Sequence, residues 1–340
     1  MSSKLTIKRI AELAGVSKAT VSRVLNGYPH ISDQVREQVQ KVIDETGYQP
    51  NQVARSLASD RSNIIGLVIP SGPQAVFTDP YFSVLIESIS QATNSNKLTL
   101  ALFIFQTEEE GLDTVSGILS TGLLDGLIIT ADYKGELVTS KLASNSMPFV
   151  LIGRPNQPLG ITSIDTDNVA GSYQATMYLI ESGYKRVATI ASNQNTSGED
   201  RLTGYCKALE EVGLPFTEKL VAYGDYSLDS GYDAMKQLAP EKPDSVYIAS
   251  DTMALGALRY LREINVQVPD DVAIVSHDDL APALQADPQL TTIQQPIAST
   301  GIRAVEVLME LIAGDNIPAR QIVLPNKLIV RASCGTVQLG

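Results

Sequence analysis

Short, continuous apolar runs recur along most of this 340-residue chain, and they constrain its fold more than any other feature. They lie at residues 64–69, 98–104, 126–130, 149–152, 186–190, 245–248 and 272–275. Segments long enough for a helix, such as residues 81–95 and 170–183, separate them. Apolar runs of this kind are typical of parallel strands that helices cover on both faces. The pattern predicts two doubly wound α/β lobes, which bind ligands at the carboxyl ends of their strands.

The composition agrees with a large aliphatic core in this region. About 280 residues follow residue 60, which is enough for one large or two medium lobes. The chain is 44% hydrophobic and 19% charged, so it can bury a sizeable core. Aromatic residues make up only 6% and Trp is absent. We therefore expect aliphatic and β-branched side chains to fill that core.

The first 50 residues have a different pattern, that of a helix-turn-helix. Apolar residues at positions 7, 10, 11 and 14 have helical spacing, and Gly15 can adopt the left-handed turn between two helices. Ser17 is a good N-cap for the second helix. The outward face of that helix carries short or cationic side chains, namely Lys18, Ala19, Thr20, Ser22 and Arg23. This mixture suits a recognition helix in a DNA major groove, although an ordinary helical hairpin would show similar spacing.

Two further helices are predicted after the helix-turn-helix. Ser32 begins a third helix, which Gly47 ends. Residues 51–59 form a helix of only about two turns, which is too short to be stable alone in water. Leu57 on this segment is either covered by the following domain or inserted as an apolar wedge into a DNA minor groove.

The charge is unevenly distributed along the chain. Residues 1–60 hold eight Lys or Arg and six Asp or Glu, a net charge of +2 in a chain of formal net charge −12. A mildly basic head on an acidic body concentrates affinity for nucleic acid at one end of the chain.

Several classes of protein are disfavoured. The chain has two Cys and two His, without metal-binding or redox spacing, and it has no phosphate-binding loop or dinucleotide fingerprint. We therefore expect no metal, no cofactor and no enzymatic activity. Apolar runs fall short of the roughly 18 residues that a membrane span needs. Charged residues interrupt the N-terminal segment where a signal peptide would lie, so we expect a cytoplasmic protein without membrane partners.

The head resembles the lac repressor/galactose repressor family of bacterial transcription regulators. The residues that carry the resemblance are those at 15–17, 20–26 and 51–58. The body resembles the two-lobed fold of periplasmic binding proteins. The resemblance implies a helix-turn-helix domain at residues 1–50, a hinge helix and linker at 51–61, and an effector-binding and dimerisation domain at 62–340. It implies an N-lobe of residues 62–162 and 293–322 and a C-lobe of residues 163–292 and 323–340.

The resemblance also implies the DNA contacts of the head. Lys18, Ala19 and Arg23 are expected to read bases, and Arg23 suits a bidentate contact with guanine. Contacts with phosphate or sugar are expected from Thr20, Ser22, Asn26 and Tyr48. Further DNA contacts are expected from Thr6, Ser17, His30, Asn51, Ala54 and Leu57.

Polar and aromatic residues near the strand ends are candidates for a ligand cleft. In the N-lobe they are Asp79, Tyr81, Phe82 and Arg154, and in the C-lobe Ser197, Arg201, Tyr226, Asp251 and Asp278. By resemblance, Arg201 and Asp278 match the main hydroxyl-binding pair and Tyr226 the aromatic that covers the ligand. Alternatively, Arg201 and Asp278 form a structural ion pair, Tyr81 or Phe82 belongs to the lobe core, and Arg154 lies in a solvated loop.

We therefore expect a repressor of sugar-utilisation genes. A homodimer would bind pseudo-palindromic double-stranded operator DNA, and a small carbohydrate between the lobes would switch its affinity. An α-glucoside such as maltose or sucrose is favoured over a purine. The alternatives are control by a corepressor or a phosphorylated protein partner, a solute-binding receptor, and, more distantly, an enzyme acting on sugars.

Overall fold

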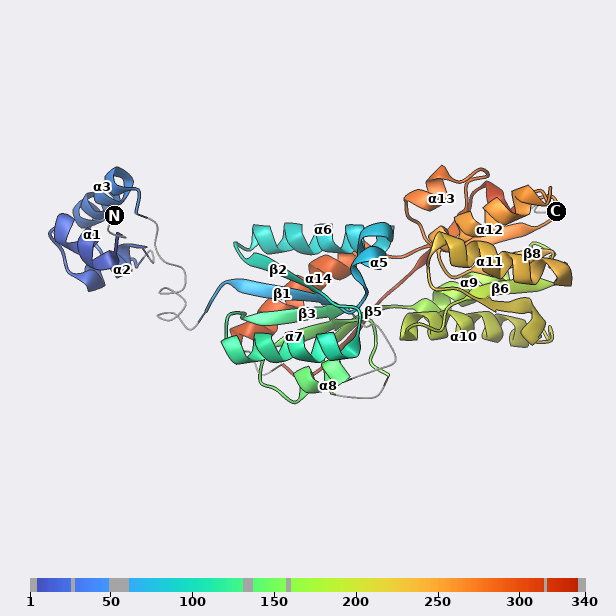
Figure 1. Cartoon of the computed structure of the whole chain (residues 1–340), viewed down its shortest axis with the longest axis horizontal. Helices are drawn as coiled ribbons and strands as arrows, with labels where there is room; N and C mark the ends of the chain where they lie inside the picture. The colour runs from blue at the N-terminus through green and yellow to red at the C-terminus, as the bar shows by residue number, and fades with distance from the viewer. Residues whose placement is uncertain are drawn as a thin grey trace. The chain divides into compact units, whose positions relative to one another are not determined.

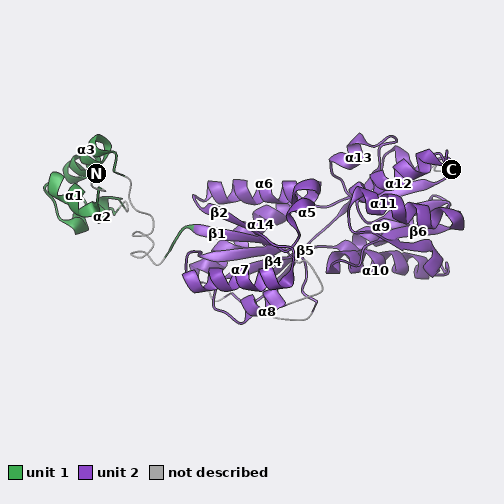
Figure 2. Ribbon diagram, in the orientation of Figure 1, with its two compact units in different colours: residues 1–63 green, residues 64–340 purple. Residues whose placement is uncertain are grey.

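The computed structural model describes residues 5–25, 28–48, 61–130, 137–156, 160–314 and 317–335. The chain divides into two compact units, residues 1–63 and residues 64–340 (Figure 2). In the described part of the chain, no helix is both long and apolar enough to cross a membrane.

The first unit is a helical head that contains the predicted helix-turn-helix. Its helices are α1 (Ile7–Leu13), α2 (Lys18–Leu25) and α3 (Asp33–Thr46). Gly15 makes the turn between α1 and α2 with φ +60°, which an L side chain rarely adopts. The Ser17 hydroxyl caps α2 by accepting from the Thr20 amide at 3.0 Å. Ser32 occupies the N-cap position of α3, but its side chain makes no capping hydrogen bond. The predicted hinge helix at residues 51–59 lies outside the described residues.

The second unit begins with a lobe built on a six-stranded parallel sheet of order β11-β5-β4-β3-β1-β2 (Figure 1). Its strands are β1 (Ile64–Ile69), β2 (Thr99–Ile104), β3 (Gly126–Thr130), β4 (Phe149–Ile152), β5 (Ser163–Thr166) and β11 (Gln321–Leu324). Its helices are α5 (Pro73–Thr78), α6 (Pro80–Ser95), α7 (Glu108–Thr121), α8 (Leu137–Ala143) and α14 (Ile297–Ala313). Helices α6 and α14 pack together on one face of the sheet, and α7 and α8 pack together on the other.

The other lobe has a sheet of order β12-β10-β9-β8-β6-β7, in which only the edge strand β12 is antiparallel to its neighbour. Its strands are β6 (Val187–Ala191), β7 (Val221–Tyr223), β8 (Ser245–Ile248), β9 (Ala273–Asp278), β10 (Thr291–Gln294) and β12 (Lys327–Ile329). Its α-helices are α9 (Asn168–Glu181), α10 (Thr196–Glu211), α11 (Leu228–Leu238), α12 (Asp251–Glu263) and α13 (Ala281–Gln285). Short 3₁₀ helices are η1 (Glu218–Leu220), η2 (Ala239–Glu241) and η3 (Ala332–Cys334).

The chain crosses between the lobes three times. The crossings run from Thr166 at the end of β5 to Asn168 at the start of α9, through Gln295 and Pro296 after β10, and through residues 325–326 after β11. These positions lie a few residues later than the predicted lobe boundaries, because β5 pairs with β11 in the first sheet (Ser163 with Gln321) and β10 pairs with β9 in the second (Thr291 with Val275). All three strands before the crossings are short, and β5 and β10 contain polar residues, so a search for apolar runs passes over them.

Helices α11 and α12 approach so closely that only glycine fits at their contact. A Cβ atom on Gly256 would lie 1.9 Å from the Leu228 carbonyl oxygen, and a Cβ on Gly231 would lie 2.1 Å from the Met253 carbonyl oxygen. Both neighbours are backbone atoms, which cannot move aside as a flexible side chain would. The two helices are therefore held together along their backbones.

Substitution of Gly256 tests this contact. We expect Gly256→Ala to destabilise the protein by about 1–3 kcal/mol, because the helices must separate to admit the methyl group. Gly117 in α7 is the matched control, since it is exposed and nothing lies within 4 Å of its Cβ position. Gly117→Ala should stabilise by about 0.5–1 kcal/mol through helix propensity. Calorimetric unfolding of both variants measures the difference, and equal effects would contradict the close contact.

Candidate functional site

A cavity of about 550 Å³ lies between the two lobes of the second unit. Residues from both sheets and from the second crossing line it, including Asp79, Tyr81 and Asp165 on one side and Arg201 and Tyr226 on the other. Its volume lies within the usual range for small-molecule sites, roughly 300–1,000 Å³. The cavity lies at the carboxyl ends of the parallel strands, where ligands bind in doubly wound folds.

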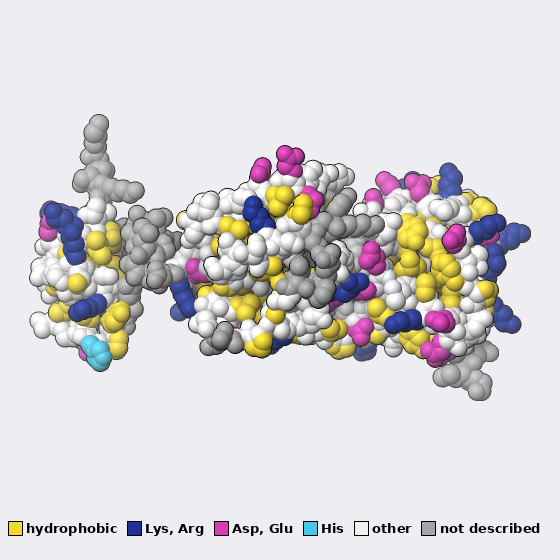
Figure 3. Space-filling view, turned by 90° about the horizontal axis from the view of Figure 1, so that it is seen from below, with side chains coloured by type: hydrophobic (Ala, Val, Ile, Leu, Met, Phe, Trp, Pro, Cys, Tyr) yellow, Lys and Arg dark blue, Asp and Glu magenta, His cyan; other side chains and the backbone are white. Residues whose placement is uncertain are grey.

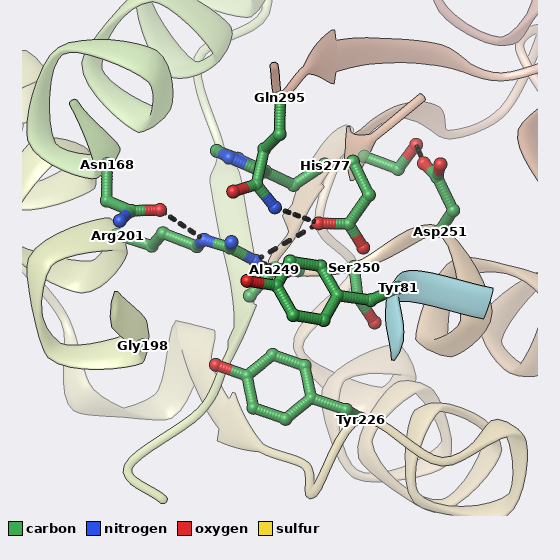
Figure 4. A network of polar contacts seen from close by, with 12 residues as sticks. Tyr81, Asn168, Gly198, Arg201, Tyr226, Ala249, Ser250, Asp251, His277 and Gln295 are labelled. Atoms are coloured by element: carbon green, nitrogen blue, oxygen red, sulfur yellow. Dashed lines mark hydrogen bonds and ion pairs between the residues drawn. The ribbon is translucent and has the colours of Figure 1, made fainter. Parts of the chain in front are cut away.

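Arg201 and Asp278 form a buried ion pair that lines this cavity, and Figure 4 shows Arg201 within a network of polar contacts. The Arg201 Nη1 atom lies 3.5 Å from Asp278 Oδ1, and the two residues are 5% and 8% exposed. Arg201 also donates to the Asn168 side chain at 3.0 Å and to the Ala249 carbonyl oxygen. Burial raises the pKa of the Asp278 carboxyl well above its usual value, and the Arg201 guanidinium opposes this shift.

The backbone at the end of β9 determines where Asp278 points. Asp278 and Asp279 have φ values of +117° and +59°, a region that L residues rarely adopt. The Asp278 carboxylate accepts from the Gln295 amide at 2.6 Å within the cavity. The Asp279 carboxylate instead pairs with Arg331 at 2.5 Å. The strained turn therefore sends two adjacent carboxylates to different partners.

Aromatic rings line the cavity beside the ion pair. Tyr81 and Phe82, at the start of α6, form an edge-to-face pair with ring centroids 5.4 Å apart. Asp79 caps this helix by accepting from the Tyr81 amide at 2.9 Å, which places both rings against the cavity. Tyr226 lies near Arg201 in the loop between β7 and α11, in the same lobe as the ion pair (Figure 4), and its hydroxyl donates to Asn195 Oδ1 at 3.1 Å.

The described lining of the cavity is rich in carboxylates. It contains Asp79, Asp165, Asp225 and Asp278, against the single guanidinium of Arg201. Burial raises the pKa of Asp165 to about 6, and the Asp200 carboxylate adds to the shift. An excess of carboxylates disfavours anionic ligands and provides acceptors for hydroxyl groups.

Most of the cleft residues predicted from the sequence line the cavity. These are Asp79, Tyr81, Phe82, Ser197, Arg201, Tyr226 and Asp278. Arg154 is absent from the lining and forms a bidentate ion pair with Asp200, with both nitrogen–oxygen distances 2.7 Å. Since Arg154 follows β4 and Asp200 lies on α10, this pair joins the two lobes. Arg154 is therefore neither a solvated loop residue nor a lining residue.

Asp251 is a correction to the predicted set. It is fully buried and does not line the cavity. Its carboxylate accepts from Ser276 Oγ at 2.6 Å, the Leu280 amide at 2.7 Å and Thr292 Oγ1 at 2.8 Å. A buried carboxylate needs such donors, so Asp251 holds β9, β10 and the start of α13 together. Its position after a strand, which suggested a ligand contact, does not reveal that the side chain points inward.

Some lining residues escaped the sequence analysis. Asp165 and Thr166 end β5, and Gln295 follows β10, which are strands that the apolar pattern did not reveal. Asn195 and Asp225 lie in loops after β6 and β7. Had the polar strands β5 and β10 been recognised, Asp165, Thr166 and Gln295 would have joined the predicted site, because all three lie at strand ends.

The head presents most of the predicted DNA-contact residues at its surface. Those that are exposed are Thr6, Ser17, Lys18, Ala19, Arg23 and His30, and those that are half-buried are Thr20 and Ser22. Tyr48 differs, because its side chain is only 8% exposed and packs in the helical core. Asn26, Asn51, Ala54 and Leu57 lie outside the described residues. In the view of Figure 3, Asp and Glu side chains are scattered over the second unit.

Comparison with known proteins assigns both parts of the chain. Residues 6–51 match the family of bacterial regulatory proteins, lacI family. Residues 176–334 match the periplasmic binding protein-like domain. A similar protein is the HTH-type transcriptional regulator CelR of Thermobifida fusca, which is 36% identical over 96% of this chain and 98% of CelR. The HTH-type transcriptional repressor PurR of Edwardsiella ictaluri is 32% identical over 96% of each chain.

Solved structures agree over the whole length. A complex of the transcriptional regulator CelR with cellobiose has a TM-score of 0.77 at 34% identity, covering 97% of this chain and 99% of CelR. The lac repressor dimer bound to operator and the anti-inducer ONPF has a TM-score of 0.88 at 27% identity, covering 98% and 100%.

The helix-turn-helix head and the two-lobed body with its cleft define a DNA-binding transcription regulator. More specifically, the chain belongs to the lacI family of bacterial regulatory proteins. Regulators of this family are not enzymes.

The ionisation of Asp165 is testable through stability. Because burial raises its pKa from 3.8 to about 6, the folded protein binds this proton more tightly than the unfolded chain does. The contribution of Asp165 to stability is therefore present at low pH and is lost as the pH rises from 3.8 to about 6. Asp165→Asn cannot ionise and keeps an oxygen acceptor for the Thr166 amide. We expect Asp165→Asn to melt at a higher temperature than wild type at pH 7.5. The difference in melting temperature between the two proteins should be smaller at pH 5.

Thermal unfolding at both pH values measures this effect. Asp113→Asn is the control, because Asp113 is exposed on α7, outside the cavity. A difference between Asp165→Asn and wild type that stays constant between the two pH values would contradict the raised pKa.

Proposed function

We propose that this protein is a sugar-responsive repressor that acts in the bacterial cytoplasm. A homodimer binds a pseudo-palindromic operator through its two heads, and a small neutral carbohydrate in the cleft changes the operator affinity. The observation that carries the proposal is the combination of Arg201 and Asp278 with aromatic rings and an excess of carboxylates in one cavity.

The chemistry of the cavity favours a neutral polyhydroxylated ligand. A planar guanidinium and carboxylates hydrogen-bond neighbouring hydroxyls, and aromatic faces such as that of Tyr226 suit the apolar C–H surface of a sugar ring. The excess of carboxylates repels phosphate groups, which argues against a sugar phosphate. The similar regulator CelR was solved with cellobiose, so cellobiose is the first probe, beside the α-glucosides maltose and sucrose.

A dimer is supported by the needs of DNA recognition and by a similar solved structure. A single recognition helix reads few base pairs, whereas two related heads read two half-sites. The lac repressor, similar over the full length, was solved as a dimer on its operator.

The recognition helix can be tested by one substitution. Arg23 is exposed on α2. Arg23→Ala should weaken binding to genome-selected DNA by about 1–3 kcal/mol, which corresponds to roughly 5- to 150-fold. It should also relax the sequence preference at one base pair. Lys41→Ala is the control, since Lys41 is an exposed cation on α3. Fluorescence anisotropy at one fixed salt concentration measures both. Equal losses in the two variants would mean that Arg23 supplies only general charge.

The effector can be identified with the same measurement. We expect one neutral disaccharide among cellobiose, maltose and sucrose to change DNA affinity about 5- to 150-fold. Glucose 6-phosphate should have no effect, because its charge meets the carboxylates of the cleft. A response to the phosphate alone, to a purine alone or to no small molecule would contradict the proposal. The last result would favour a protein partner.

A further inference from the structure

The buried ion pair of the cleft is hydrogen-bonded to two of the three lobe crossings. Arg201 Nε donates to Asn168 Oδ1 at 3.0 Å, and Asn168 lies two residues beyond β5, in the first crossing. Asp278 Oδ1 accepts from Gln295 Nε2 at 2.6 Å, and Gln295 follows β10 directly, in the second crossing (Figure 4). Each member of the pair is thus attached to a different crossing.

The two crossings are also bonded to each other. Thr166 Oγ1 donates to Gln295 Oε1 at 3.1 Å, and Asn168 Nδ2 donates to the Thr166 carbonyl oxygen at 3.2 Å. The bonds form a closed ring through Arg201, Asn168, Thr166, Gln295 and Asp278. All five residues are at most 9% exposed, so water competes little with these bonds.

Gln295 has a special place in this ring. Both polar atoms of its side-chain amide are engaged, Nε2 with the cleft carboxylate and Oε1 with the Thr166 hydroxyl. A planar amide held at both ends cannot turn at one end without changing the other. A ligand hydroxyl that binds Asp278 Oδ1 shares that oxygen with Gln295 and Arg201, and so alters the bond between the crossings.

We propose that Gln295 is a positioning residue that couples occupancy of the cleft to the geometry of the lobe crossings. This inference rests on the proposed function. In this scheme the effector binds Asp278 and changes its hydrogen bond with Gln295. The Gln295 amide then shifts its hydrogen bond with Thr166, which changes how the first and second crossings are held together and so how the lobes are arranged.

The neighbouring Gln294 is a matched control within the same chain. It has the same side chain and lies one residue earlier, on β10, so it points to the opposite face of the strand. It is exposed, does not line the cavity, and donates to Asp279 Oδ2 at 2.7 Å.

The first experiment needs no ligand. Hydrogen exchange is followed in the sugar-free full-length protein for wild type, Gln295→Ala, Thr166→Val and Gln294→Ala. We expect faster amide exchange at residues 166–168, 295 and 297 in the first two variants, because each breaks the bond between Thr166 and Gln295. Thr166→Val preserves side-chain shape and keeps the test valid if Gln295→Ala folds poorly. If the crossing residues exchanged their amide hydrogens no faster in Thr166→Val than in Gln294→Ala, the proposal would be overturned.

The second experiment separates coupling from ligand binding. Calorimetry gives the affinity for cellobiose, maltose and sucrose, and anisotropy gives DNA affinity with and without each sugar. The coupling is the ratio of the DNA affinities measured without and with sugar. In Thr166→Val this ratio should move toward 1 by a factor of about 2 to 30, and the affinity for the sugar itself should change by a smaller factor. Thr166→Ser retains the hydroxyl and should restore the ratio. Equal loss of sugar affinity and coupling, or failure of Thr166→Ser to rescue, would overturn the role of Gln295.

Failure of the proposed function gives a different result. In that case wild type itself shows no change of DNA affinity with any sugar. The exchange experiment then still decides whether the Thr166–Gln295 bond ties the crossings together.

Discussion

The buried pair of Arg201 and Asp278 is the interaction on which the cleft depends. Removing two charges from water is costly, and their mutual attraction repays this only when further hydrogen bonds satisfy both groups. Here Asn168 and the Ala249 carbonyl satisfy Arg201, and Gln295 satisfies Asp278. The supporting residues come from the crossings and from the end of β8, so the pair and the connections between the lobes form one polar network.

Under the proposed function, this network links occupancy of the cleft to the arrangement of the lobes. A ligand shifts an equilibrium only as far as it binds one state better than another. Hydroxyl groups that bind the pair engage atoms already bonded to both crossings, so binding and lobe arrangement are linked through the same oxygens and nitrogens. The Arg154–Asp200 bridge adds a second connection between the lobes, whose formation also depends on their separation.

The sequence predicted the helical head and most of the buried strands because their patterns are local. Gly15 and Ser17 mark the turn and the cap directly. It did not predict β5, β10 and β11, whose short or polar sequences become strands only through their neighbours in the sheet. The same limit applies to side-chain direction. Arg201 and Asp278 were placed correctly at the cavity, whereas Asp251 has equally suitable sequence surroundings but points to buried donors on β9 and β10.

The glycine contacts between α11 and α12 have a mechanical consequence. Helices whose backbones touch cannot slide past each other without losing contact along their whole length, so they behave as one stiff plate. A lobe stiffened in this way is expected to move as a body, so that a change of arrangement falls mainly on the three connections between the lobes and on the Arg154–Asp200 bridge.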